Sequence, residues 1–204
     1  MILLAVAVAK ELAAMPSRQG VTTLVAGVGP VESACAVAAE LANRRYALVV
    51  SAGLAGAFDG CAAIGDGVVI AEDTMEIALE NGTPLALPDG ERTIERARSH
   101  PALVEALARR GFAALRGITV ARVTATDETA QRLAALGAQT ESMEGFAALR
   151  AAERAGVRAL EVRGISNRCG AREKSGWDFA AGAAGLHRAL EELFSLPEIE
   201  EFAR

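Results

Sequence analysis

The chain has 204 residues, of which 51% are apolar, and it carries a net charge of −5. This length suits one domain, residues 1–204, with a full hydrophobic core, and the acidic balance without a Lys/Arg cluster argues against nucleic acid as a partner. The three cysteines are far apart and form no C-x-x-C pair, and His100 and His187 lack metal-ligand spacing, so we expect a reduced, cytoplasmic protein without a metal site.

The first apolar run, residues 1–9, has the hydrophobicity of a signal peptide but not its other features. No basic region precedes it, and it continues into Lys10 and Glu11 without a convincing cleavage site. It is also too short to span a bilayer. We therefore expect a buried first strand over residues 2–8 and no association with a membrane.

The elements that follow alternate between strand and helix patterns. Further strands are predicted over 21–28, 46–51, 68–72, 117–126 and 159–166. Helical or turn segments are predicted over 10–15, 31–43, 93–110 (interrupted near Pro101), 127–136, 145–155 and 177–194. The glycine-rich stretch 52–57 is expected to turn tightly, residues 74–91 are less regular, and Asp127 is expected to cap its helix. This order predicts an α/β fold, a three-layer α/β/α arrangement around a mixed, mostly parallel twisted sheet.

Two stretches carry the residues most suited to a binding site. Residues 140–145 place the carboxylate of Glu144 beside the thioether of Met143 at the start of a helix, and residues 161–167 form an apolar strand that ends in Ser166 and Asn167. In open α/β sheets, ligands bind where strands end beside helix N-termini. The alternative for Ser142 and Glu144 is an ordinary helix cap with an acidic first turn, and these residues alone do not decide between the two.

Common cofactor motifs are absent or incomplete. Residues 27–32 begin like a dinucleotide fingerprint, but the third glycine is missing and Glu32 stands where a pyrophosphate would need close approach. There is no P-loop and no G-x-S-x-G elbow. We therefore expect no cofactor. Glu11, directly after the first strand, is placed for acid/base chemistry, although an acidic residue that favours a helix start is the commoner role of such a residue.

Taken together, these motifs resemble the nucleoside phosphorylase/nucleosidase superfamily, and within it the methylthioadenosine/S-adenosylhomocysteine nucleosidase-like branch. The matching segments are Glu11, 25–29, 49–56, 65–69, 142–145 and 163–167. The resemblance implies that Glu11 handles a nucleophilic water. It also implies that Met143 packs against a ribose and that Glu144 accepts hydrogen bonds from its 2′- and 3′-hydroxyls, for which the two oxygens of a carboxylate are suited. Ser142, Gly53 and Ser166 lie in the same motifs and are expected to contact substrate.

Asn167 departs from the adenine-specific members of the branch, which have Asp there. An Asp protonates N7 of a 6-aminopurine, whereas the amide of Asn donates to N7 or O6, both of which are acceptors in a 6-oxopurine. Asn167 therefore favours hypoxanthine or guanine, and the resemblance is then nearest to the futalosine hydrolase family of menaquinone biosynthesis. Those enzymes split a hypoxanthine nucleoside that carries a benzoate-type tail. The alternatives are a methylthioadenosine-type nucleosidase, a purine nucleoside phosphorylase, or a binding module without catalysis.

The nucleophile and the partner of the tail carboxylate are further points of interest. Leu54 stands where related enzymes have a small polar residue, and no arginine is close in sequence to 27–29 or 51–57, so water is expected to be the nucleophile in place of phosphate. The candidate cations for the tail are Arg168, Arg172, Lys174 and Lys10.

The remaining expectations concern aromatic residues and assembly. Trp177 and Phe179 are suited to stacking on a substrate, but packing of the last helix is the favoured interpretation. The resemblance implies a homo-oligomer that binds a small nucleoside.

Overall fold

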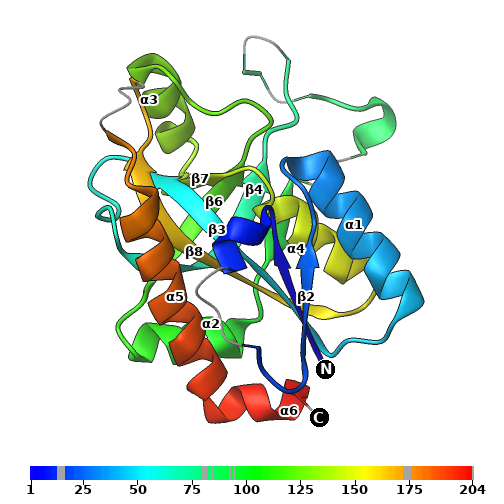
Figure 1. The fold of residues 1–204 in the computed structure, drawn as a ribbon. Helices are drawn as coiled ribbons and strands as arrows, with labels where there is room; N and C mark the ends of the chain where they lie inside the picture. The colour runs from blue at the N-terminus through cyan, green and yellow to red at the C-terminus, as the bar shows by residue number, and fades with distance from the viewer. Residues whose placement is uncertain are drawn as a thin grey trace.

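A computed structural model describes residues 1–12, 17–79, 82–83, 85–91, 93, 95–171 and 176–203. In this part of the chain eight strands form a sheet that lies at the centre of the molecule (Figure 1). The strands are β1 (Ile2–Val6), β2 (Val21–Val25), β3 (Leu48–Ala57), β4 (Gly67–Met75), β5 (Arg96–Arg98), β6 (Ala113–Thr119), β7 (Thr140–Ser142) and β8 (Arg158–Arg168).

The sheet is mixed and mostly parallel, as the sequence predicted. Its order is β2-β1-β3-β7-β6-β4-β5, and β8 pairs with both β3 and β4. The pairs β1–β2, β1–β3, β3–β8, β4–β6 and β6–β7 are parallel, whereas β3–β7, β4–β5 and β4–β8 are antiparallel. Since β3, β7, β6, β4 and β8 pair in a ring, this part of the sheet closes on itself.

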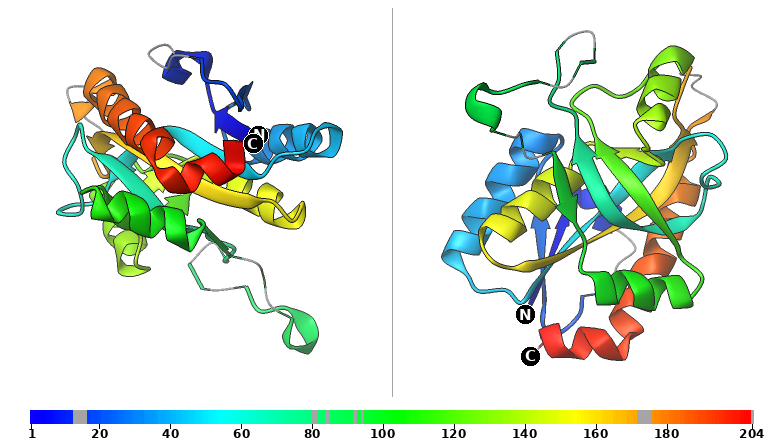
Figure 2. Two further views of the ribbon diagram at one scale, coloured as in Figure 1. Left: turned by 90° about the horizontal axis from the view of Figure 1, so that it is seen from below. Right: turned by 180° about the vertical axis from the view of Figure 1, so that it is seen from behind.

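Helices cover the sheet on both faces, which confirms the three-layer expectation. The helical segments are η1 (Ala9–Leu12), α1 (Pro30–Asn43), η2 (Pro88–Gly90), α2 (Pro101–Arg109), α3 (Asp127–Ala135), α4 (Gly145–Arg154), α5 (Phe179–Ser195), η4 (Pro197–Ile199) and α6 (Glu200–Ala203). Side chains of α2 and α5 belong to one hydrophobic cluster, and those of α1 and α4 belong to another. Figure 2 shows from two further sides that the connection carrying η2 extends away from the body of the fold.

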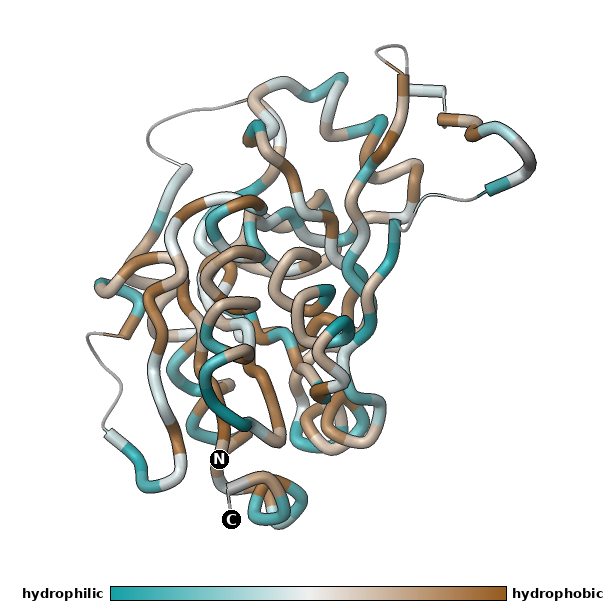
Figure 3. The backbone as a smooth tube through the Cα atoms, turned by 90° about the vertical axis from the view of Figure 1, so that its right-hand side faces the viewer, coloured by the Kyte–Doolittle hydropathy of each residue, from teal (hydrophilic) through white to brown (hydrophobic). Residues whose placement is uncertain are grey.

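Strand β1 shows how the two clusters arise from one sheet. Successive side chains of a strand point to opposite faces. Ile2 and Leu4 pack with the α2/α5 cluster, whereas Leu3 and Ala5 pack with the α1/α4 cluster, and all of them are buried. Figure 3 shows hydrophobic colours along the central strands and mixed colours along the helices, as expected for strands covered on both faces. No helix within the described residues is both long and apolar enough to cross a bilayer.

Helix α5 packs unusually close to the sheet because glycines face each other. A Cβ atom built on Gly164 of β8 would lie 2.0 Å from the carbonyl oxygen of Gly182, and one built on Gly67 of β4 would lie 2.4 Å from that of Gly185. Backbone therefore meets backbone, which leaves no room for any larger residue at these positions. This contact sets the distance between α5 and the strand that carries Ser166 and Asn167.

Several predicted elements differ from the structure. The stretch 52–57 does not turn: β3 continues through it, paired with β8 over its whole length. The first part of the predicted helix 93–110 contains β5, because Arg96–Arg98 pairs with β4 and Arg98 forms an ion pair with Glu72 at 2.8 Å. In both cases pairing along the sheet overrides the local preference of the residues.

Other boundaries shift by a few residues. The strand predicted over 117–126 is β6 and ends at Thr119, and β7, which the sequence did not predict, is three residues long. Thr126, not Asp127, caps α3, because the Thr126 hydroxyl accepts the N–H of Thr129. Asp127 instead accepts the N–H of Ala171. The end of the predicted segment 10–15 lies outside the described residues.

Candidate active site

A pocket of about 830 Å³ lies where β1, β3 and β8 end and α4 begins. These three strands are parallel, so their carboxyl ends meet at one edge of the sheet, which is where open α/β sheets bind ligands. The predicted site residues that line it are Glu11, Ser142, Met143, Glu144, Ser166 and Asn167. Gly53, the remaining predicted contact residue, is not part of the lining.

The carboxylate of Glu11 is held by three backbone N–H groups. Its Oε2 accepts from Ala7 at 3.0 Å and from Val8 at 3.1 Å, and its Oε1 accepts from Leu54 at 3.1 Å. The short helix η1 therefore folds its acid back onto the end of β1 and across to β3. A carboxylate has about four acceptor sites. The described residues fill two of these sites on Oε2 and one on Oε1, which leaves one site on Oε1 to accept from a water in the pocket.

Glu144 is the residue before α4, but its side chain does not cap that helix. Its Oε1 accepts the N–H of Gly29 at 2.9 Å, whereas the Ser142 hydroxyl accepts the N–H of Gly145 at 3.3 Å. Ser142 thus performs the capping role considered for this stretch. The carboxylate of Glu144 lies against the start of α1 with Oε2 facing the guanidinium of Arg163 at 3.8 Å.

Arg163 is a site residue to which the sequence analysis assigned no role. Its side chain is 1% exposed, and its Nε donates to Glu161 at 2.8 Å while Nη2 donates to Ser51 at 3.3 Å. Burial by itself lowers the pKa of Arg163, but the charges of Glu161 and Glu144 outweigh burial and raise that pKa, so the guanidinium stays charged. A charged residue within the apolar strand 159–166 was the available sequence signal.

Gly53 makes room for this arginine. A Cβ atom built on it would lie 2.6 Å from Nη1 of Arg163 and 2.9 Å from Oε1 of Glu11. The glycine therefore lets the arginine approach Glu11 across β3. Its place is behind the pocket wall, between two charged side chains.

No arginine is close to residues 51–57 in the sequence, but Arg163 is close to them in the folded chain, so the expectation that this region has no arginine was wrong. Arg163 reaches Ser51 and Gly53 from the neighbouring strand β8, because the two strands pair in parallel register. Its charge is nevertheless balanced by Glu161 and faces Glu144. The described part of the site keeps an excess of acidic groups, which disfavours a phosphate anion.

The amide of Asn167 has a defined orientation. Its Nδ2 donates to the carbonyl oxygen of Arg168 at 3.0 Å, and its Oδ1 accepts from the hydroxyl of Ser166 at 2.9 Å. Because a carbonyl oxygen accepts and cannot donate, the NH₂ group must face Arg168. Among the described residues the second N–H of Nδ2 has no acceptor, so it can donate to a ligand in the pocket.

Glu141 also lines the pocket, although the sequence analysis gave it no role. It is buried, and it accepts hydrogen bonds from both the N–H (3.0 Å) and the hydroxyl of Thr124. Burial raises the pKa of Glu141, and the hydrogen bonds from Thr124 oppose that rise. Glu141 thus fastens the loop before α3 to β7.

The other side of the pocket is apolar and aromatic. Trp177 and Phe179 line it with their ring centroids 5.3 Å apart, and Leu54 and Leu186 complete this wall. Phe179 is 56% exposed, so the favoured interpretation of this residue, packing within the protein, was wrong. An exposed aromatic ring at a pocket wall is suited to contact a ligand.

The candidate cations for a substrate tail differ in whether they line the pocket. Lys10 lines the pocket, whereas Arg168 does not and is paired with Asp59 at 3.3 Å, with 77% of its side chain exposed. Arg172 and Lys174 lie outside the described residues.

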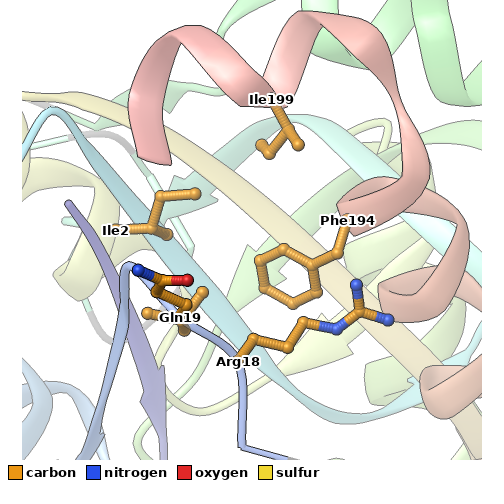
Figure 4. A pocket seen from close by; sticks show the side chains of 6 residues that line it. Ile2, Arg18, Gln19, Phe194 and Ile199 are labelled. Atoms are coloured by element: carbon orange, nitrogen blue, oxygen red, sulfur yellow. The ribbon is translucent and has the colours of Figure 1, made fainter. Parts of the chain in front are cut away.

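A smaller cavity of about 250 Å³ lies at the opposite end of the sheet, beside the first residues of β1 and β2. Figure 4 shows Ile2, Gln19, Phe194 and Ile199 around it, with the guanidinium of Arg18 5.3 Å from the centre of the Phe194 ring. None of the predicted site residues lines this cavity. The larger pocket is therefore the candidate active site.

Comparison with known proteins places this geometry in a family. The family model of the phosphorylase superfamily matches residues 12–202. The futalosine hydrolase of Thermus thermophilus is 36% identical over 184 residues, which cover 86% of this chain and 82% of the relative. The futalosine hydrolase of Acidothermus cellulolyticus is 39% identical over 184 residues, which cover 84% and 72%.

Solved structures share the fold at lower identity. The 5′-methylthioadenosine/S-adenosylhomocysteine nucleosidase of Neisseria meningitidis, in complex with methylthio-immucillin-A, superimposes with a TM-score of 0.81 at 16% identity and covers 95% of this chain and 97% of its own. The futalosine hydrolase of Helicobacter pylori gives a TM-score of 0.81 at 14% identity, covering 95% and 96%.

Proposed function

The chain belongs to the phosphorylase superfamily and, within it, to the futalosine hydrolase family, and from this membership and its pocket we propose that it hydrolyses the N-glycosidic bond of futalosine. The products are hypoxanthine and dehypoxanthine futalosine, and the reaction is a step of menaquinone biosynthesis. The observation that carries the proposal is the pocket itself, where Glu11, Glu144 and Asn167 converge at the ends of three parallel strands. No cofactor is required.

The proposed reaction exchanges one bond for another at the anomeric carbon. The bond between C1′ and the purine nitrogen breaks through an oxocarbenium-like sugar, and the oxygen of water bonds to C1′. Glu11 orients this water through the free site on Oε1 and accepts its proton. The purine leaves with the bonding electron pair and takes a proton from solvent water, while Asn167 donates a hydrogen bond to it. Glu11 then returns the proton of the attacking water to solvent, so that the protons balance. Glu144 accepts the ribose hydroxyls, and Met143 packs against the sugar.

The test of this proposal is an end-point assay with purified protein. Futalosine, inosine and methylthioadenosine are each offered with and without phosphate, and free base, free sugar and sugar phosphate are separated by chromatography. Hypoxanthine release from futalosine without phosphate is expected. Release only with phosphate would identify a phosphorylase, and adenine release from methylthioadenosine alone would identify an adenine-type nucleosidase. Thermal stabilisation by futalosine without turnover would identify a binding module.

Replacing Asn167 by Asp is expected to change the base preference. A carboxylate meets the acceptors N7 and O6 of hypoxanthine without a proton to donate, and a lost hydrogen bond to a buried group costs about 1.5–3 kcal/mol, so kcat/KM for futalosine falls about 10- to 100-fold. The measurement is the ratio of kcat/KM for hypoxanthine and adenine nucleosides with the same tail, which controls for misfolding within one sample. An unchanged ratio would remove Asn167 from base recognition.

Lys10 is proposed to bind the carboxylate of the tail. It is the candidate cation that lines the described pocket, on the turn that also holds Glu11. Exposed ion pairs contribute about 0.2–1 kcal/mol, so Lys10→Met is expected to raise KM for futalosine about two- to fivefold. KM for inosine, which has no tail, should not change, and Arg168→Gln should affect neither. An equal effect of Lys10→Met on both substrates would exclude a contact with the tail.

We also propose that the protein is cytoplasmic and forms a homo-oligomer. Val28, which lines the pocket, is 54% exposed, and its neighbours Val25 and Val31 are 51% and 69% exposed. Apolar side chains gathered beside a pocket favour an interface with a second copy. Light scattering coupled to size exclusion measures the mass, and a monomer at assay concentration would contradict this proposal.

A further inference from the structure

Two buried carboxyl groups lie behind the active site, and neither of them lines the pocket. Asp73 on β4 is 0% exposed and Glu161 on β8 is 1% exposed. A Cβ atom built on Gly145, the first residue of α4, would lie 2.3 Å from Oδ2 of Asp73 and 2.2 Å from Oε1 of Glu161. Both carboxyl groups therefore lie in close contact with Gly145, the residue that follows Glu144.

One buried oxygen of this pair has no hydrogen-bond donor among the described residues. Asp73 accepts a hydrogen bond from the hydroxyl of Thr119, whose oxygen lies 3.2 Å from each carboxyl oxygen of Asp73. Oε1 of Glu161 accepts a hydrogen bond from Nε of Arg163, but within the described residues no donor faces the buried Oε2 of Glu161. Oδ2 of Asp73 and Oε1 of Glu161 lie around the same point beside Gly145, and two carboxylates so close together cannot both be ionised at ordinary cost. A proton held between them would remove that repulsion.

We propose that Asp73 and Glu161 share one proton and that this buried acid pair positions Glu144 and Arg163 for catalysis. The proposal rests on the hydrolase function for its catalytic part only. With the proton present, the pair presents one negative charge to one guanidinium, so the buried cluster of three groups is neutral.

The pair reaches Glu144 along two routes. On one side, Glu161 holds Arg163, whose Nη1 faces Oε2 of Glu144 at 3.8 Å. On the other side, Asp73 receives the hydroxyl of Thr119, whose oxygen accepts the N–H of Phe146 in the first turn of α4 at 2.8 Å. The acid pair thus fixes both the start of the helix and the cation that faces the sugar-binding carboxylate.

The electrostatic surroundings agree with a neutral Asp73. Burial, then the charge of Glu161 and the hydrogen bond with it, raise the pKa of Asp73 well above its ordinary value, while Arg163 and Thr119 oppose the rise. The charged groups that face the pair are Arg163 from its own strand β8 and Glu144 at the start of α4. Because the pKa of the folded form is raised, the folded state gains relative stability at low pH and loses it as the pH rises toward that pKa.

The first test compares unfolding across pH, without substrate. In Asp73→Asn, the amide supplies permanently the hydrogen that the shared proton supplies. Between the unfolded pKa of Asp, about 4, and the raised folded pKa, the unfolding equilibrium constant of the natural protein is expected to rise by about tenfold per pH unit relative to that of Asp73→Asn. Glu72→Gln, which changes an adjacent acid in ion pairs with Arg96 and Arg98, is the control and should show no such trend.

The second test reads the proton directly. The infrared carbonyl band of a protonated carboxylic acid should be present near neutral pH and absent in Asp73→Asn. Its absence from the natural protein would overturn the shared proton, whatever the substrate proves to be. Equal pH dependence of unfolding in both proteins would do the same.

The third test separates positioning from folding. Asp73→Asn should keep kcat within about threefold, because it preserves both hydrogen bonds. Glu161→Gln, which removes the anionic partner of Arg163, should lower kcat about 100-fold with a smaller change in KM, since a small displacement of a catalytic group has effects of this size. If folded Asp73→Asn lost as much activity as Glu161→Gln, an ionised Asp73 would be required and the proposal would be wrong. A folded Glu161→Gln with natural kcat would exclude the positioning role.

Discussion

Glu11→Gln is expected to lower kcat about 100- to 10,000-fold, the usual contribution of a general base. The amide can still accept the N–H groups of Ala7 and Val8 through its oxygen, which keeps the side chain in place. Its NH₂ group then occupies the position of Oε1, where it meets the N–H of Leu54 and has no acceptor for the proton of a water. Single-turnover hydrolysis of futalosine measures the chemical step.

The control for this variant is Glu32→Gln, the same chemical change at an exposed acid near the start of α1 that does not line the pocket. It should keep natural kcat. In Glu11→Gln a donor faces the N–H of Leu54, which could destabilise the fold. Circular dichroism and thermal unfolding therefore measure whether this variant is folded. Turnover close to that of the natural protein by a folded Glu11→Gln enzyme would exclude proton transfer to Glu11.

The fold could be predicted where local pattern and final environment agree. The helix predicted over 31–43 is α1, which begins one residue earlier at Pro30, and the apolar run at the start of the chain became a strand covered on both faces. The stretch 52–57 could not be predicted in the same way, because its glycines serve close approach and not a turn. Only the positions of Arg163 and Glu11 on either side of Gly53 explain why a long strand contains this residue.

The site was predicted to a similar extent. The motif residues Glu11, Met143, Glu144 and Asn167 converge in one pocket, although their roles stay predictions until they are tested. Arg163 was missed as a site residue because its partners come from other strands, and its proximity to Ser51 depends on the parallel register of β3 and β8. The prediction that no arginine lies near residues 51–57 was therefore wrong, because it considered distance along the sequence only. The excess of acidic groups at the site still favours water over phosphate as the nucleophile.

The acid pair explains why an arginine is tolerated in this core. Removing one partner of a buried ion pair costs about 3–5 kcal/mol, whereas the pair itself contributes little net stability. Arg163 is therefore expected to be retained for what it does at the site more than for stability. Its Nη1 faces Oε2 of Glu144 at 3.8 Å, and the charge of Glu11 acts on it across Gly53, so one buried cation interacts electrostatically with both carboxylates to which we assign roles in the reaction.

Glu144→Gln is the second substitution with a large expected effect, because it removes a negative charge beside the developing oxocarbenium ion. If its oxygen keeps the N–H of Gly29, the NH₂ group faces Arg163 and no longer accepts a hydroxyl; if the amide turns over, NH₂ meets the N–H of Gly29. A hydrogen bond to a charged group contributes about 1.5–3 kcal/mol, so the loss of one of them should lower kcat/KM about 10- to 150-fold.

The ribose itself provides the sharper measurement. The natural enzyme should prefer futalosine over its 2′-deoxy analogue, and Glu144→Gln should reduce this preference toward unity, because the group that distinguishes the two substrates has lost its charge. Glu141→Gln, at a nearby acid whose oxygens are taken by Thr124, should leave the preference intact. Had Glu144 only fastened α4 to α1, both substrates would lose activity in the same proportion, and the ratio would stay that of the natural enzyme. A preserved ratio would therefore assign Glu144 to the structure and leave the ribose hydroxyls to another group.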